Sequence, residues 1–225
     1  TSTKKTAYLL KKKQLIPLSY PEVSKINDRW LRVGKKNSLG IVDTEGIGVA
    51  LMQFKQLSPV NISMVLSLTN SGYGLIDDRG TVLLPNIYKK IIAWNNYGFW
   101  VKENNTYALL NEAGKITFPE VYDSIKASNL NRCAVQKNKK WGIIDHRGRW
   151  IQAASYAAAS IFENGLMATY QQNKWAILDL EGKRVLEQKV DSIKAAYPYL
   201  IVYNNHKAGL IDATGTWILP CEYDA

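Results

Sequence analysis

Carboxylate side chains recur along the sequence at a nearly constant interval, and they are the groups that could most directly do chemistry. Each of six Asp or Asn residues stands three residues before a glycine: Asp43, Asp77, Asn111, Asp145, Asp179 and Asp212. Asp-rich turns bind Ca²⁺ when several oxygens converge. Here each turn offers one fixed acid, and the neighbouring positions vary. An Asp that opens a turn by accepting a backbone N–H explains the series, so we expect no metal site.

The histidines and cysteines form no recognisable catalytic arrangement. His146 lies inside an Asp-x-x-Gly turn and His206 lies in a hairpin turn, so we interpret both as variable turn residues. Cys133 occupies a strand position where other repeats hold Met or Phe, which favours a small buried hydrophobic side chain. Neither it nor Cys221 has CxxC spacing, and the sequence has no HExxH, GxxxxGK[ST] or GxGxxG string. These patterns predict a protein that is not an enzyme and uses no cofactor.

Binding residues can be nominated on the basis of exposure and charge. Trp100 takes a strand position that varies freely between repeats, so we expect an exposed ring that could stack on a sugar, a base or a protein. Lys11, Lys12 and Lys13 are the other candidates. They belong to residues 1–36, where ten basic and two acidic groups supply most of the net charge of +10. Such a basic end could attract a polyanion, or simply keep a terminal strand from aggregating.

These residues are positioned by a repeated unit. The glycine of the Asp-x-x-Gly phrase recurs at intervals of 34 residues, and once of 33, at Gly46, Gly80, Gly114, Gly148, Gly182 and Gly215. A fixed period of this length indicates a repeat architecture. Most units also carry an aromatic residue seven before this marker, Gly or Ala six before it, and an aromatic residue eight after it. Several carry Pro five after it.

The segments between turns are short and rich in β-branched and aromatic residues, so they are predicted to be strands. In the unit around Gly114 we expect strands at 98–102, 106–111, 115–118 and 122–125. Asn104 and Asn105 form a hairpin turn, and Pro119 ends the third strand because it cannot donate to the ladder. In the first strand, apolar residues stand fifteen and thirteen before the marker, with a variable residue between them. This alternation predicts one buried and one free face.

Together these units predict an all-β protein of tandem antiparallel meanders, each about 34 residues long. A four-stranded meander suits a blade of a β-propeller-like ring, and six can be written from Tyr20 to Leu219. Because 34 residues is short for a propeller blade, an open β-superhelix or solenoid array is the alternative. One unit cannot bury its own apolar face, which explains why the phrase is repeated.

The repeated phrases resemble the WG repeat family, also called KWG repeats. The match rests on 140–145 with Gly148, which reads KWGIID, on 73–77 with Gly80, which reads YGLID, and on the Pro220 and Tyr223 tail. It covers residues 1–225 as a single WG-repeat domain, with residues 1–36 as a degenerate basic first repeat. Leu39-Gly40, Trp175-Ala176 and Ala208-Gly209 depart from the Trp-Gly pair. The resemblance implies a bacterial β-repeat protein of the binding or interaction type.

We therefore expect a non-catalytic interaction module that binds another protein. A glycan or cell-envelope polymer is one alternative ligand, and a polyanion such as nucleic acid, bound through residues 1–36, is a second. No run of 18 or more apolar residues predicts a transmembrane helix. Because the sequence begins at Thr1 without Met, an upstream signal peptide or domain is a natural expectation, and it favours a periplasmic, secreted or cell-surface location over a cytoplasmic one.

Overall fold

The computed structural model describes residues 7–11, 14–18, 20–44, 47–61, 63–77, 79–126 and 130–224 of the chain. Within these ranges every regular element is a β-strand except one short 3-10 helix. Contacts divide the chain into two compact units, the first reaching Ala93 and including Val101–Asn104, the second containing Trp94–Trp100 and the residues from Asn105 onward. The predicted all-β fold is confirmed.

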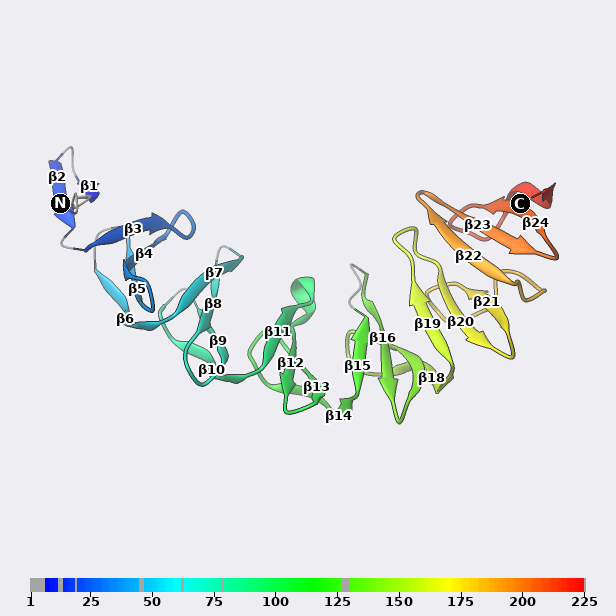
Figure 1. Ribbon diagram of the computed structural model, residues 1–225, viewed down its shortest axis with the longest axis horizontal. Coiled ribbons are helices and arrows are strands. Elements are labelled where there is room, and N and C mark those ends of the chain that lie inside the picture. The colour runs from blue at the N-terminus through cyan, green and yellow to red at the C-terminus, as the bar shows by residue number, and fades with distance from the viewer. Residues whose placement is uncertain are drawn as a thin grey trace. The chain divides into compact units, whose positions relative to one another are not determined.

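The first unit begins with a hairpin and continues with two four-stranded sheets (Figure 1). The hairpin pairs β1 with β2, and the sheets have the orders β3-β4-β5-β6 and β7-β8-β9-β10, all antiparallel. Their strands, with the β11 strand that follows, are β1 (Ala7–Lys11), β2 (Gln14–Leu18), β3 (Glu22–Lys25), β4 (Trp30–Lys35), β5 (Ser38–Asp43), β6 (Gly48–Phe54), β7 (Gln56–Asn61), β8 (Met64–Leu68), β9 (Tyr73–Asp77), β10 (Val82–Tyr88) and β11 (Lys90–Ala93).

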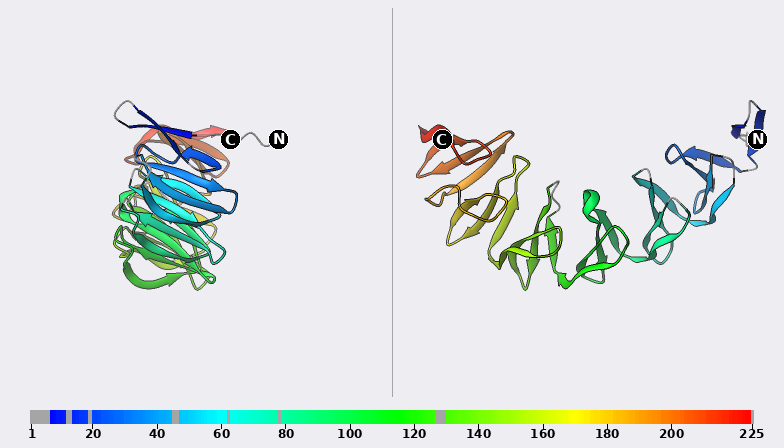
Figure 2. Two further views of the ribbon diagram at one scale, coloured as in Figure 1. Left: turned by 90° about the vertical axis from the view of Figure 1, so that its left-hand side faces the viewer. Right: turned by 180° about the vertical axis from the view of Figure 1, so that it is seen from behind.

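The next sheet has the order β11-β12-β13-β14, and the division between the units falls inside it. The second unit continues with sheets β15-β16-β17-β18, β19-β20-β21 and β22-β23-β24-β25, which follow one another from green to red in Figure 2. The elements are η1 (Asn95–Tyr97), β12 (Phe99–Glu103), β13 (Thr106–Leu110), β14 (Ile116–Tyr122), β15 (Ser124–Lys126), β16 (Arg132–Lys137), β17 (Lys140–Asp145), β18 (Trp150–Tyr156), β19 (Ala158–Ile161), β20 (Met167–Gln171), β21 (Lys174–Leu178), β22 (Ser192–Ala196), β23 (Tyr199–Asn204), β24 (Lys207–Ile211) and β25 (Trp217–Asp224).

The predicted tandem meander is thereby confirmed. Each four-stranded sheet opens with a short strand, which begins just after the residue that stands eight after a marker glycine or, in the first sheet, just after Tyr20. It continues through two strands joined by a hairpin and ends with the strand after the Asp-x-x-Gly turn. The fifth repeat is the exception, because its last strand is replaced by isolated bridges from β21 to Arg184 and Val190. Closure of the units into a ring stays a prediction.

The Asp-x-x-Gly phrase is a hydrogen-bonded turn, as its sequence predicts. In the fourth repeat, Asp145 Oδ1 accepts the backbone N–H groups of Arg147 and Arg149, each at 2.9 Å. Gly148 closes the turn at φ +80°, a region that favours glycine. The same pair of turn hydrogen bonds is made by Asp77, Asp179 and Asp212. The interpretation of these acids as turn-forming residues is confirmed.

The prediction that Pro119 ends its strand is wrong. Pro119 lies inside β14, and the equivalent Pro85 and Pro220 lie inside β10 and β25. Each of these strands is the outermost of its sheet, so a missing N–H on the solvent side breaks no ladder. The register of β14 on β13 also shifts between Ala108 and Leu110, as expected where a bulge accommodates the proline.

The glycine beside the motif aromatic residue allows the outermost strand to lie close to its neighbour. A Cβ on Gly142 would stand 2.5 Å from the carbonyl oxygen of Gln152 and 2.6 Å from the Trp150 ring. A Cβ on Gly209 would stand 2.6 Å from the Trp217 ring. The residues that come close to these glycines therefore belong to the strand after the turn and include its first aromatic side chain.

The apolar core lies between consecutive sheets within each unit. In the first unit, β3–β6 supply Trp30, Ile41 and Phe54, which pack with Leu57 and Val65 of the following sheet. In the second unit one cluster joins the sheet of β16 and β17 to that of β19, β20 and β21, with members Ala134, Ile143, Ala159, Met167, Ala176 and Leu178. Stacked sheets thus bury what one meander cannot bury alone.

The predicted free face of the first long strand in each repeat is wrong for the middle of the chain. Ala134 and Ala168 occupy the variable position, and both are fully buried. Their sheets have neighbours in the second unit, so the second face of the strand is covered as well as the first. Alternation over three residues predicts one buried face, but it carries no information about a sheet packed on the other side.

Candidate functional site

Trp100, the predicted exposed binding residue, is buried. Its side chain is 1% exposed, its ring stacks on Trp94 with centroids 5.7 Å apart, and it meets the edge of Tyr122 at 5.7 Å. The prediction of an exposed ring is wrong, because the rings of Trp94 and Tyr122 pack against it. Trp100 is therefore a core residue of the second unit.

The aromatic contacts continue beyond Trp100. Tyr122 meets Trp150 edge to face at 5.9 Å, and Tyr97 lies 4.8 Å from the ring of His146. Trp94 Nε1 donates to the carbonyl of Leu130 at 3.0 Å. Such aromatic pairs add about 0.5–1.5 kcal/mol each beyond simple burial. The tryptophans of this region that lie outside the repeated phrase thus stabilise the packing between repeats.

The predicted lysine site stays a prediction. Lys11 lies in β1, whose backbone the structure describes, but its side chain falls outside the described residues. Lys12 and Lys13 also fall outside them.

The histidines and cysteines are placed as structural residues. His206 lies in a hairpin at φ +63°, and His146 lies in the fourth Asp-x-x-Gly turn, where its N–H donates to the carbonyl of Asn131. Cys133 is fully buried, and burial raises the pKa of its thiol well above the ordinary value, which keeps it protonated and unreactive. Across the described ranges, no group of three or more His, Cys, Asp or Glu residues could hold a metal ion.

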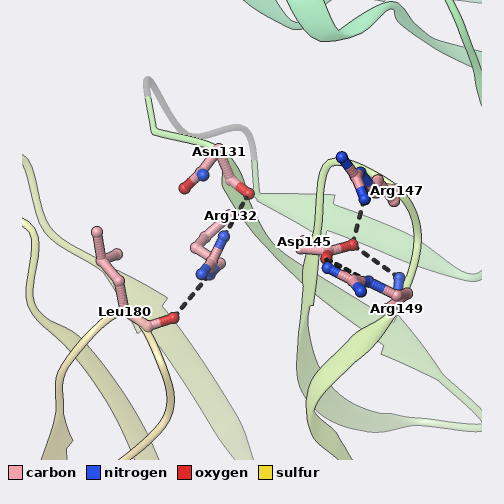
Figure 3. A network of polar contacts seen from close by, with 6 residues as sticks. All are labelled: Asn131, Arg132, Asp145, Arg147, Arg149 and Leu180. Atoms are coloured by element: carbon pink, nitrogen blue, oxygen red, sulfur yellow. Dashed lines mark hydrogen bonds and ion pairs between the residues drawn. The ribbon is translucent and has the colours of Figure 1, made fainter.

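The strongest buried polar network surrounds Asp145 (Figure 3). This carboxylate is 2% exposed. Besides its turn hydrogen bonds it accepts from Arg149 Nε at 2.8 Å and lies 2.7 Å from Arg149 Nη2. Burial by itself raises the pKa of Asp145, but the hydrogen bonds from Arg149 and Arg147 outweigh it and hold the pKa below its usual value.

Arg132 joins this turn region to the next repeat. Its Nε donates to the carbonyl oxygen of Leu180 at 2.8 Å, and its Nη1 donates to that of Asn131 at 3.2 Å (Figure 3). Leu180 lies in the following Asp-x-x-Gly turn. Arg132 thus ties two adjacent repeats of the second unit together, and its Nε and Nη1 donate to backbone carbonyls.

Exposed apolar side chains gather instead on the outermost strands. In β14, Ile116 is 67% exposed and Val121 is 49% exposed. The equivalent positions in β10 hold Val82 and Ile87, and the corresponding strand β25 exposes Ile218, Leu219 and Tyr223. The sequence pattern did not single out these residues. Apolar residues two and seven after the marker glycine are the signal that could have found those of β10 and β14.

A cleft of about 400 Å³ opens in the second unit between the turn after β19 and the turn before β23. Tyr197 is 72% exposed and Tyr199 is 37% exposed, and both line it with Phe162, Glu163 and Asn164. Asn164 Oδ1 accepts the N–H of Leu166, while its buried amide nitrogen has no hydrogen-bond partner among the residues described. The cleft thus combines exposed aromatic rings with polar side chains.

In the described part of the chain, no helix is long and apolar enough to cross a membrane. No curated protein matches the sequence.

Several solved structures resemble the chain at low sequence identity. Hsv2p of Kluyveromyces lactis is 8% identical with a TM-score of 0.43, and the match covers 85% of this chain and 74% of that one. The WD40 β-propeller domain of Doa1 is 12% identical with a TM-score of 0.31, over 77% and 71% of the two chains. PorZ of Porphyromonas gingivalis, a surface component of the type-IX secretion system, is 11% identical with a TM-score of 0.35, over 89% of this chain and 32% of that one.

A family match agrees with the repeat phrase. The WG containing repeat family matches residues 107–141, 141–175 and 209–225. These stretches contain the Tyr107, Trp141 and Gly209 phrases, and their boundaries follow the 34-residue period. The resemblance read from the sequence is confirmed in these three stretches, each of which matches the WG containing repeat.

Proposed function

We propose that this chain is a non-catalytic module that binds another protein through the outermost strands of its sheets. The observation that supports the proposal is the repeated exposure of apolar side chains on these strands, in β14 above all. Soluble proteins expose few contiguous apolar patches unless these bind something. The outermost strand β14 also presents unpaired backbone groups along its open edge, interrupted at Pro119, which has no N–H. We infer that the ligand is an extended segment of a partner protein, which pairs with the edge and covers the apolar side chains.

The fourth repeat provides a matched control within the same unit. Ser155 in β18 stands seven residues after its marker glycine, as Val121 does in β14, and it is also exposed. The two positions thus share strand type and exposure but differ in hydrophobicity. A carboxylate introduced at either one changes the net charge equally.

The test is affinity capture from lysate and envelope fractions of the source cell, at low and high salt, with proteins identified by mass spectrometry. We expect a protein partner that survives high salt with the wild type and with Ser155→Glu. The substitution Val121→Glu should reduce its capture about tenfold, since a buried apolar side chain contributes roughly 1–2 kcal/mol.

Equal capture by both variants would contradict a role for the outer strands. Capture of nucleic acid alone, lost at high salt, would instead indicate polyanion binding through the basic residues 1–36.

A second candidate function, glycan binding, is favoured by the cleft at Tyr197 and Tyr199. Exposed tyrosine rings present an apolar face for a sugar, and Glu163 and Asn164 supply polar groups beside it. Glycan-array binding by the wild type, lost on Tyr197→Ala with Tyr199→Ala, is the expected result. Tyr223→Ala removes an exposed tyrosine outside the cleft and should bind normally. Equal loss in both variants, or no array signal, would exclude the cleft as a glycan site.

A further inference from the structure

A second recess in the second unit differs from the tyrosine cleft in being polar and basic. Its volume is about 160 Å³, and it lies between β18 of the fourth repeat and β20 and β21 of the fifth. Lys174, Arg184 and Lys189 line it together with Gln171, Tyr156 and the buried Thr169. Among the residues that the structure describes, no acidic one lines it.

The recess exists because the fifth repeat departs from the others. In the fourth repeat, strand β18 pairs with β17 and passes close over Gly142. In the fifth, the segment after Gly182 forms no strand on β21, and its β-bridges to β21 are those of Leu178 with Arg184 and of Trp175 with Val190. Between these bridges lies Ala176, which lines the recess.

The alanine alone does not open the recess. Ala108 replaces the same glycine in the third repeat, yet β14 still pairs beside it. The fifth repeat also has Glu187 where three others have proline, and Val190 where most have an aromatic residue. The loss of the whole outer-strand pattern leaves the space, and the cationic side chains of this segment then border it.

The charge in the recess is incompletely neutralised. Lys174 Nζ lies 2.5 Å from Asp191 Oδ1, so this cation has a partner. In the described part of the chain, the side chains of Arg184 and Lys189 form no ion pair. Gln152 is committed internally, since its amide donates to the carbonyl of Gly182 and its oxygen accepts from Tyr156. Two cations are therefore available to a ligand.

We propose that this recess binds a tetrahedral dianion, the phosphate end of a small phosphate monoester. Arginine offers a planar fork that matches such oxygens, and lysine adds a compact charge. The volume is below the roughly 300–1,000 Å³ of pockets that hold drug-sized ligands, so it suits an anionic group rather than a whole cofactor. This site uses none of the exposed apolar side chains of β14, and it does not depend on the proposed function.

The test is a titration of the full chain followed by amide chemical shifts in NMR, at constant ionic strength. The probes are inorganic phosphate, sulfate, an alkyl phosphate monoester and the corresponding diester, with chloride as reference. We expect saturable shifts near Gly182 and Lys189 with the first three probes and much weaker ones with the diester, which carries a single charge. Sulfate and phosphate then show which oxyanion is preferred.

The variant Arg184→Gln with Lys189→Gln should raise the dissociation constant about tenfold or more, since charged hydrogen bonds are lost. Lys183→Gln with Lys194→Gln removes the same charge from exposed positions that do not line the recess, and it should change the constant by less than about twofold. Each single substitution at Arg184 and Lys189 is measured too, in case the double variant folds poorly. Shifts that do not saturate, or equal weakening by both pairs, would overturn the proposal.

Discussion

Trp100→Ala is expected to lower the free energy of unfolding of the second unit by about 3–5 kcal/mol. The side chain is 1% exposed and lies between the rings of Trp94 and Tyr122, so its removal leaves a large cavity lined by rigid aromatic groups. Urea unfolding followed by far-ultraviolet circular dichroism measures the effect without relying on tryptophan fluorescence.

Trp100→Phe is the matched control. Trp100 Nε1 is buried and has no hydrogen-bond partner among the described residues, so phenylalanine removes volume without breaking a hydrogen bond. We expect it to lose clearly less stability than alanine. A loss below about 1 kcal/mol for Trp100→Ala would show that the ring is solvent-accessible in solution, as the sequence pattern suggested, because surface substitutions rarely exceed that range.

The outcome at Trp100 shows which parts of this protein could be predicted from local sequence. The turn at Asp145 and Gly148 depends on hydrogen bonds between residues no more than four apart in the sequence, so the sequence alone identified it. The repeat period then followed from the recurrence of that turn. Burial at Trp100 and Ala134 depends instead on contacts made by other strands and neighbouring repeats, and a three-residue alternation does not encode these.

The candidate sites also differ in whether the sequence alone could predict them. Ile116 and Val121 stand at fixed offsets from Gly114, so their exposure on an outer strand could have been inferred once the strand order was known. The basic recess could not have been inferred from the sequence. The sequence marks the fifth repeat as irregular at Ala176 and Glu187, but whether the altered segment collapses or leaves a space depends on how its two bridges hold it.

Asp145→Ala is expected to lower the free energy of unfolding by about 2–3 kcal/mol at neutral pH, because it removes a buried acceptor of charge-assisted hydrogen bonds. Asp145 accepts two backbone N–H groups and the Arg149 guanidinium, whereas Asp179 makes the same turn hydrogen bonds with no ion pair among the described residues. Asp179→Ala is therefore the matched control, and we expect it to lose about 1 kcal/mol less.

The pH dependence separates the charge of Asp145 from its packing. The pKa of Asp145 in the folded chain is below its usual value, and the unfolded value is about 3.9. Its contribution is therefore complete above the unfolded pKa and is lost as pH falls through the folded pKa. The stability difference between wild type and Asp145→Ala should be constant from pH 7 to about pH 5 and shrink below about pH 4. A difference that stays constant across the acid range would show that Asp145 stabilises the fourth turn by its shape and not by its charge.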